Sequence, residues 1–291
     1  QTITGLIGNL TNFANLRVNN TFLSGNVTLG ANTNIRVNQD LVLTAGTLND
    51  GGNTITSIGD IQNSATHTSV ATGKIICQGS VKQFIGGNGT GKFGNLTIDN
   101  IAGVSNTANQ TVNNILNLNN GSLFIDAYVL RLAETASVTG AFSGARMIQT
   151  NGLLSDSGVV KNFAAGTANF LFPIGSDVDY MPVNYNITAN SAAGSIRVYP
   201  VKTQHPATTD ALDLELDYFW VVRGTGFSGL ALTHTYNYQD IFVNGNEAAY
   251  VTGRYVVPQW DPIGGIPGTV DPTLNTMTLT GVNFIDGDYT C

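Results

Sequence analysis

Acidic side chains stand at alternate positions in two segments of the second half of the chain, a spacing that could hold a metal ion. Asp213, Glu215 and Asp217 share one face of an expected strand, because side chains in a strand alternate between its two faces. Asp177 and Asp179 follow a Gly-Ser turn. Carboxylate oxygens at such spacings suit Ca²⁺, and the alternative is a solvated acidic face. No Asp-x-Asp-x-Asp-Gly loop occurs, so the sequence predicts no cofactor other than this calcium alternative.

The residues that carry hydrolytic chemistry form no motif. The three histidines are isolated, which argues against zinc, and each is expected at the surface. Glycoside hydrolysis needs two carboxylates within roughly 5–10 Å, and the six acids of the first half share no short motif. No Gly-x-Ser-x-Gly elbow occurs. The sequence therefore predicts that the protein is not an enzyme, and a polysaccharide-cleaving enzyme is the alternative that an acidic cleft would support.

Aromatic residues of the last third are candidates for sugar binding. Exposed rings could serve as platforms for glycans, and alternation along the strands predicts that about half of these rings belong to the core instead. The candidates are Tyr236, Tyr238, Tyr250, Tyr255 and Trp260.

Composition limits the classes of partner. Only 11% of the 291 residues are charged, and the net charge is −7. Nucleic acid is not expected as a partner, because phosphate contacts need clustered Lys and Arg. Membrane insertion is not expected either, because no apolar run approaches the ~20 residues of a spanning helix. Cys77 and Cys291 are the only cysteines, and the sequence leaves open whether they pair or stay free.

The elements that would position these residues are strands. Short segments of alternating apolar and polar residues follow one another closely, and glycines separate them, at 16–18, 26–29, 34–37, 41–43 and 54–58. Phe13–Asn20 matches Phe93–Asn100 at an offset of 80, and Val37–Leu48 matches Val112–Leu123 at an offset of 75. These matches predict a unit of about 75–80 residues that occurs twice. Repetition without helices favours a β-solenoid-like repeat domain, which we place at residues 1–155.

The remainder, residues 156–291, predicts a different domain. Its expected strands are longer and more aromatic, and Pro-rich turns separate some of them. About seven such strands favour an antiparallel β-sandwich. They are expected at 170–173, 181–188, 194–201, 214–222, 230–238, 248–256 and 277–280. The fold class is therefore all-β throughout.

Several motifs together carry a family resemblance. They are Phe-x-Asn-Leu-x-Ile/Val, Val-Asn-x-x-Leu-x-Leu-x-x-Gly-Thr/Ser-Leu, Asn169–Gly175, Tyr180–Val183 and Leu216–Val222. With these motifs the chain resembles the repeat-rich surface and secreted proteins of Bacteroidota, many of which use type IX secretion. The resemblance implies an extracellular or cell-surface location, an adhesive or matrix role, and removal of a signal peptide before Gln1.

The first ten residues point to assembly. Ile3, Leu6, Ile7 and Leu10 make this segment apolar and β-prone, with no charge to protect it. Open strand edges recruit further strands, so a homo-oligomer built by strand addition is expected. The leading hypothesis is an extracellular structural protein that forms a fibre or surface layer. An adhesin that binds surface glycans, through Tyr236, Tyr238 or Trp260, is the alternative.

Overall fold

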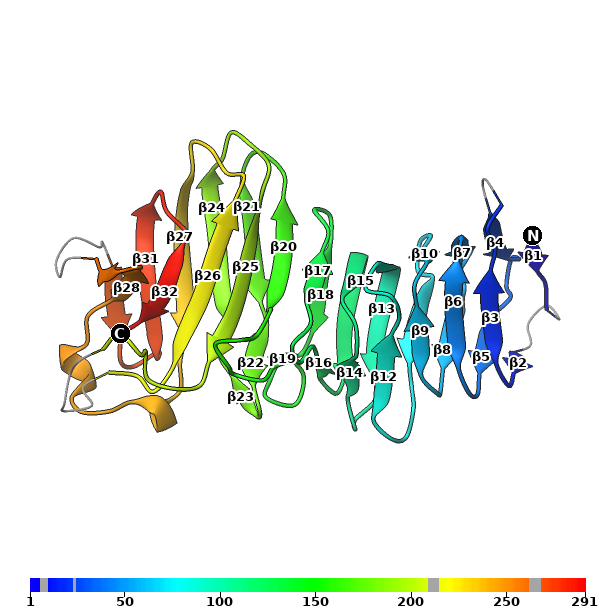
Figure 1. Ribbon diagram of the computed structural model, residues 1–291, viewed down its shortest axis with the longest axis horizontal. Helices are drawn as coiled ribbons and strands as arrows, with labels where there is room; N and C mark the ends of the chain where they lie inside the picture. The colour runs from blue at the N-terminus through cyan, green and yellow to red at the C-terminus, as the bar shows by residue number, and fades with distance from the viewer. Residues whose placement is uncertain (6–9, 23–24, 209–214, 262–267) are drawn as a thin grey trace. The chain divides into compact units, whose positions relative to one another are not determined.

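The computed structural model describes residues 1–5, 10–22, 25–208, 215–261 and 268–291 (Figure 1). The chain divides into two compact units, residues 1–148 and 149–291. The boundary predicted from the sequence, after residue 155, lies seven residues further along the chain. The first unit is a parallel β-solenoid, and the second contains two antiparallel sheets. The predicted fold class is confirmed.

Three stacks of parallel strands form the first unit. In the described residues, the first stack runs β2–β5–β8–β11–β13–β15–β18. A second stack starts β1–β4–β7–β10–β13, and a third runs β3–β6–β9–β12–β14–β16. The strand bounds are β1 Thr2–Ile3, β2 Thr11–Phe13, β3 Leu16–Asn19, β4 Asn26–Leu29, β5 Ile35–Val37, β6 Leu41–Ala45, β7 Thr47–Asn49, β8 Thr54–Ser57, β9 Ile61–Asn63, β10 Thr66–Thr68, β11 Lys74–Cys77, β12 Gln83–Gly86, β13 Gly91–Asp99, β14 Val104–Asn106, β15 Gln110–Asn120, β16 Leu123–Phe124, β17 Leu130–Leu132 and β18 Ser137–Gly140.

Apolar side chains stack in columns inside the solenoid. The column with the most regular register runs Ile35, Ile55, Ile75, Leu96 and Leu116, and every member is at most 1% exposed. A coil is one turn of the solenoid, and each coil places one residue in the column. Each coil therefore covers the apolar face of the next, which is how solenoids build a core. Alternation of apolar and polar residues in the sequence therefore predicted both the strands and the side that faces inward.

The coil itself is shorter than the repeat seen in the sequence. Successive members of that column are 20, 20, 21 and 20 residues apart. The matched sequences do not occupy equivalent places, because Leu16 lies in β3 of the third stack and its counterpart Leu96 lies in β13 of the first stack. The two-unit interpretation is therefore wrong as a structural repeat. An offset of 75–80 residues spans several coils and ends on a different face.

The glycine common to both matched segments has one structural role. Gly46 and Gly121 both have positive φ angles, +84° and +96°, which favour glycine. Both also lie against the preceding coil, where an added Cβ would come within 2.4 Å of the carbonyl oxygen of Asn20 and 1.9 Å of that of Asn100. A side chain at either corner would push adjacent coils apart.

Substitution at this corner should separate steric overlap from backbone strain. We expect Gly121→Ala to destabilise the first unit by about 3 kcal/mol, about 1 from the left-handed backbone and about 2 from overlap with Asn100. Gly89→Ala is the matched control, because its φ is +85° and its nearest neighbour lies at 3.8 Å; it should cost about 1 kcal/mol. Denaturant-dependent labelling of the buried Cys77 thiol reports this unit, and equal losses in the two variants would contradict the overlap.

The second unit is a sandwich of two antiparallel sheets. One sheet has the order β20–β25–β26–β32–β28–β29, and the other β21–β24–β27–β31–β30. Their bounds are β20 Val159–Phe163, β21 Ala168–Phe172, β24 Val183–Ala189, β25 Gly194–Val201, β26 Phe219–Thr225, β27 Ala231–Asn237, β28 Gly253–Val256, β29 Gln259–Trp260, β30 Gly268–Asp271, β31 Thr276–Val282 and β32 Gly287–Thr290; β19 Ile148–Thr150, the hairpin β22 Ile174–Ser176 and β23 Asp179–Tyr180, and the 3₁₀ turns η1 Asp240–Phe242 and η2 Glu247–Ala249 complete the described elements.

Aromatic side chains fill the space between these two sheets. Trp220 of β26 and Tyr289 of β32 each lie with ring centroids 5.0 Å from Tyr236 of β27. His234 of β27 stacks on Tyr185 of β24 at 5.5 Å. All five side chains are fully buried. The strands of this half are rich in aromatic residues because large rings from the two sheets fill the core between them.

Candidate functional site

The first coil of the solenoid has open strand edges. Among the described residues, β1 pairs only with β4, β2 only with β5, and β3 only with β6. These three strands are coloured dark blue around the N-terminus in Figure 1. Each therefore presents one edge that no described strand covers. Such an edge is a template for another strand.

Alternate residues of the first coil carry the uncovered backbone groups. The N–H of Thr11 donates to Asn34 O at 3.0 Å, and the N–H of Leu16 donates to Asp40 O at 3.1 Å, so these residues face the second coil. Peptide groups alternate in direction along a strand. The N–H and C=O groups of Asn12 and Arg17 therefore point to the open side.

The interior of the first coil opens at the same edge. A pocket of about 610 Å³ is lined by β1, β3 and the start of β4. Leu16, Val18 and Val27 form its apolar part, and Gln1 and Arg17 are among its polar lining. Leu16 is 9% exposed and Val27 7%, whereas the column residues deeper in the solenoid are at most 1% exposed. The core is thus least covered where the edges are open.

Little charge protects this edge from pairing. Residues 1–39 contain two arginines, Arg17 and Arg36, and no acid; the first acid is Asp40. Natural proteins commonly guard open edges with lysines, prolines, bulges or a covering helix. The described part of residues 1–22 contains no lysine, proline or covering helix, and its one register shift lies between Val18 and Asn19 of β3.

The four predicted assembly residues are only partly described. Ile3 lies in β1 and is half-buried, and its carbonyl accepts a hydrogen bond from Gly30 N at 2.8 Å. Leu10 is 49% exposed just before β2. Leu6 and Ile7 lie outside the described residues. The open edge therefore belongs to the whole first coil, which includes Ile3 and Leu10.

Two of the three predicted sugar platforms are wrong. Tyr236 is fully buried in the sandwich, and Tyr238 is 4% exposed with its hydroxyl donating to Glu247 Oε1 at 2.5 Å. Neither ring can offer a face to a glycan. Trp260 is half-buried against Tyr255, and its Nε1 donates to Ala207 O at 3.3 Å; its role in binding stays a prediction.

A lysine already holds one pair of the predicted calcium ligands. Lys202 Nζ lies 2.8 Å from Asp177 Oδ2 and 2.8 Å from Asp179 Oδ2. These two carboxylates raise the pKa of Lys202, so the ammonium stays charged. A calcium ion at this place would have to displace that ammonium group. Asp177 is a turn residue with φ +53°, which fits a short hairpin between β22 and β23.

The second predicted acidic group is not assembled into a site. Glu215 is half-buried and burial raises its pKa, which disfavours the charged form that binds cations. Asp217 is exposed, and Asp213 lies outside the described residues. Among the residues that the structure describes, no group of three or more His, Cys, Asp or Glu side chains could hold a metal ion.

The histidines are not at the surface, which corrects that expectation. His67 and His234 are fully buried, and His205 is 4% exposed. His67 Nδ1 accepts from Gly94 N–H at 3.3 Å, so its proton lies on Nε2, which donates to Asp50 Oδ2 at 3.2 Å. His205 Nε2 lies 3.3 Å from Asp288 Oδ2. Each of these two histidines thus pairs with an acid far away in sequence, which spacing alone could not reveal.

The Asp50–His67 pair should stabilise the solenoid. Burial raises the pKa of Asp50, but hydrogen bonds from the side chains of His67 and Ser69 and from backbone N–H groups outweigh it and hold the pKa below its usual value. We expect His67→Leu to cost about 3 kcal/mol, because it removes the imidazole partner of a buried carboxylate. The variant Asp50→Ala/His67→Leu should lose clearly less than the sum of the single changes. Additive losses in Cys77 labelling would contradict the pairing.

Both cysteines are free and buried. Cys77 occupies an inward column between Ser57 and Ile98, and burial raises the pKa of its thiol to about 12. Burial likewise raises the pKa of Cys291. Cys77 thus acts as a small apolar core residue. Within the described ranges, no helix has the length and apolar character needed to cross a membrane.

No protein-family model, no curated protein and no solved structure matched the chain.

Proposed function

We propose that the protein is an extracellular structural subunit that assembles by adding strands of a second copy to its open first coil. The observation that carries this proposal is the one-sided pairing of β1, β2 and β3. The uncovered core at the same edge would gain apolar contacts from an added coil. The resemblance to repeat-rich surface proteins supports the extracellular location.

Charge favours a head-to-tail contact between copies. Residues 1–39 carry two positive charges from arginine side chains and none from acids. Residues 149–291 carry thirteen acids and five Lys or Arg, a net charge of −8. The N-terminal segments of two copies would repel each other weakly, whereas such a segment and an acidic second unit attract. A head-to-tail contact that does not close into a ring builds filaments.

Sedimentation velocity across a wide range of protein concentration tests this proposal. We expect the average mass to rise with concentration beyond that of a dimer, and to fall at high ionic strength, where charge attraction is screened. Electron micrographs of the same samples should show linear series of particles. A chain that remains monomeric at every concentration and ionic strength would contradict self-assembly.

A further inference from the structure

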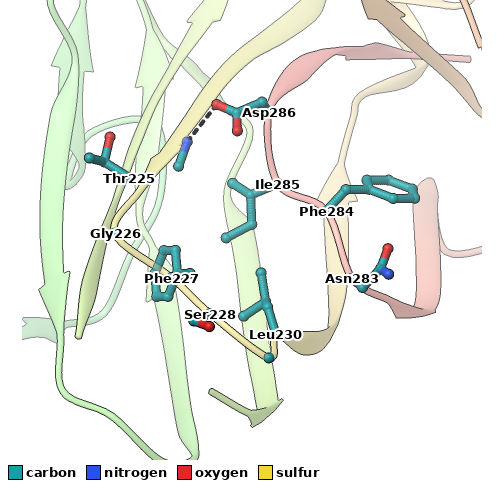
Figure 2. A pocket seen from close by; sticks show the side chains of 11 residues that line it. Thr225, Gly226, Phe227, Ser228, Leu230, Asn283, Phe284, Ile285 and Asp286 are labelled. Carbon is teal, nitrogen blue, oxygen red and sulfur yellow. Dashed lines mark hydrogen bonds between the residues drawn. The ribbon is translucent and has the colours of Figure 1, made fainter. Parts of the chain in front are cut away.

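Two loops of the sandwich enclose a pocket. One loop joins β26 to β27, and the other joins β31 to β32, so each loop connects the two sheets. The pocket has a volume of about 340 Å³ and is lined by residues 224–230 and 283–286 (Figure 2). Small-molecule sites begin at about 300 Å³. The pocket is therefore large enough for one small ligand or the end of a longer one.

One wall of the pocket is apolar and fixed in place. Figure 2 shows Phe227, Leu230 and Ile285 around its centre. The Phe227 ring lies close to the backbone at Gly194, where an added Cβ would come within 2.7 Å of the ring, and its centroid is 6.1 Å from that of Phe163. Phe227 is thus supported from behind while it remains half-buried. A ring held in this way can receive the apolar face of a ligand without reordering.

The rim of the pocket is polar, and one carboxylate is oriented. Asp286 Oδ1 accepts from Gly224 N–H at 2.9 Å, and the carbonyl oxygen of Asp286 accepts from Arg254 Nε at 2.7 Å. Among the described residues, Asp286 Oδ2 accepts no hydrogen bond and belongs to an exposed residue. Asn283 and Ser228 are exposed on the same rim. Together these groups offer acceptors and neutral donors beside an apolar wall.

This combination limits the chemical class of ligand. An anion finds no cationic side chain in the lining. The nearby Arg254 guanidinium stacks on the Phe284 ring, with Cζ 4.0 Å from the ring centroid, and pairs with Asp261. A metal ion finds one carboxylate where it needs several hard ligands. A neutral sugar presents hydroxyl groups on its edge and C–H groups on its face. We propose that this pocket binds a neutral saccharide unit, with its hydroxyls on Asp286 and Asn283 and its C–H face on Phe227.

Ligand-observed saturation-transfer NMR on the full chain tests the site, with glucose, galactose, mannose and N-acetylglucosamine as probes. At least one probe should receive saturation. Asp286→Asn keeps the size of the side chain and an acceptor for Gly224 N–H, but removes the charge-assisted hydrogen bond to a hydroxyl. We expect at least tenfold weaker binding in that variant, and a comparable loss in Phe227→Leu, which keeps apolar bulk but removes the ring.

Asp271→Asn is the matched control for the carboxylate. Asp271 also lies in the second unit and also accepts backbone N–H groups, from Thr273 and Leu274, but it does not line the pocket. Its substitution should leave saturation unchanged. The proposal is overturned if no probe is saturated, or if Asp271→Asn and Asp286→Asn weaken binding equally. Because assembly uses the first coil, a monomeric protein that binds sugar would refute assembly and leave this site standing.

Discussion

Lowering the pH from about 6.5 to about 4 is expected to reduce the free energy of unfolding of residues 149–291 by about 3 kcal/mol through one side chain, His234. Burial lowers the pKa of this imidazole to about 3, with a smaller contribution from the positive charge of Arg254. The ring lies between the sheets, where Nδ1 is 2.9 Å from the Tyr236 hydroxyl. Nε2 is buried and finds no hydrogen-bond partner among the described residues. Such a site favours the neutral ring.

The sign of this effect follows from the two states of the protein. The unfolded chain binds a proton at His234 below about pH 6.5, and the folded chain does so only near pH 3. Between these values the unfolded state holds more protons, so acid stabilises it. The contribution of His234 is therefore fully present above pH 6.5 and is lost as the pH falls toward 3.

Tryptophan fluorescence isolates the unit that contains His234, because Trp220 and Trp260 are the only tryptophans and both belong to it. Urea unfolding of the wild type and of His234→Phe would be followed between pH 7 and pH 4. The variant can lose stability at every pH, since it loses the hydrogen bond to Tyr236. The test is the slope: the variant should lack about 3 kcal/mol of the pH dependence. Parallel curves for the two proteins would show that His234 does not titrate as the structure implies.

Prolines on the open side of the first coil are expected to abolish self-association. Asn12 and Arg17 direct their N–H groups away from the second coil, so a proline there removes a donor that only an added strand could use. Asn12→Pro/Arg17→Pro should therefore keep its fold and sediment as a monomer at concentrations where the wild type associates. Far-ultraviolet circular dichroism checks the fold.

Alanines at the same positions provide the control. Asn12→Ala/Arg17→Ala removes the same side chains but keeps both backbone donors, so it should retain the strand contacts. Any weakening should be limited to what the loss of the Arg17 charge explains, and high ionic strength should reduce it. If both double variants associate like the wild type, the open edge is not the contact.

The strands of the solenoid could be predicted because each obeys the two-residue period locally. Segments 26–29 and 41–43 were expected as strands and lie in β4 and β6. The coil length could not be read in the same way. Columns tolerate apolar residues and small polar ones, so Val37, Ser57, Cys77 and Ile98 replace one another without sequence identity. Of the two pairs of segments that do match, one shares a corner glycine, Gly46 and Gly121, and these two corners lie on different faces.

The site was predicted less completely because it depends on contacts between distant segments. Tyr236 and Tyr238 gave no sign in the sequence of which face would be covered, and both are buried in the sandwich. Lys202 follows Asp177 by 25 residues, so spacing in the sequence could not show that its ammonium group contacts the carboxylates of Asp177 and Asp179. One signal was available for His67: it lies within an alternating segment, Thr66–Thr68, at the position that faces inward.

Hydrogen–deuterium exchange at increasing protein concentration tests the central claim most directly, because it reports single backbone amides. The open-edge amides of β1, β2 and β3 exchange freely unless another strand covers them. Self-assembly at the first coil predicts that Thr2, Asn12 and Arg17 become protected as concentration rises, while the amide of Gly166, which donates to Asn190 O within the second unit, does not change. Association without added protection at these three amides would contradict the account.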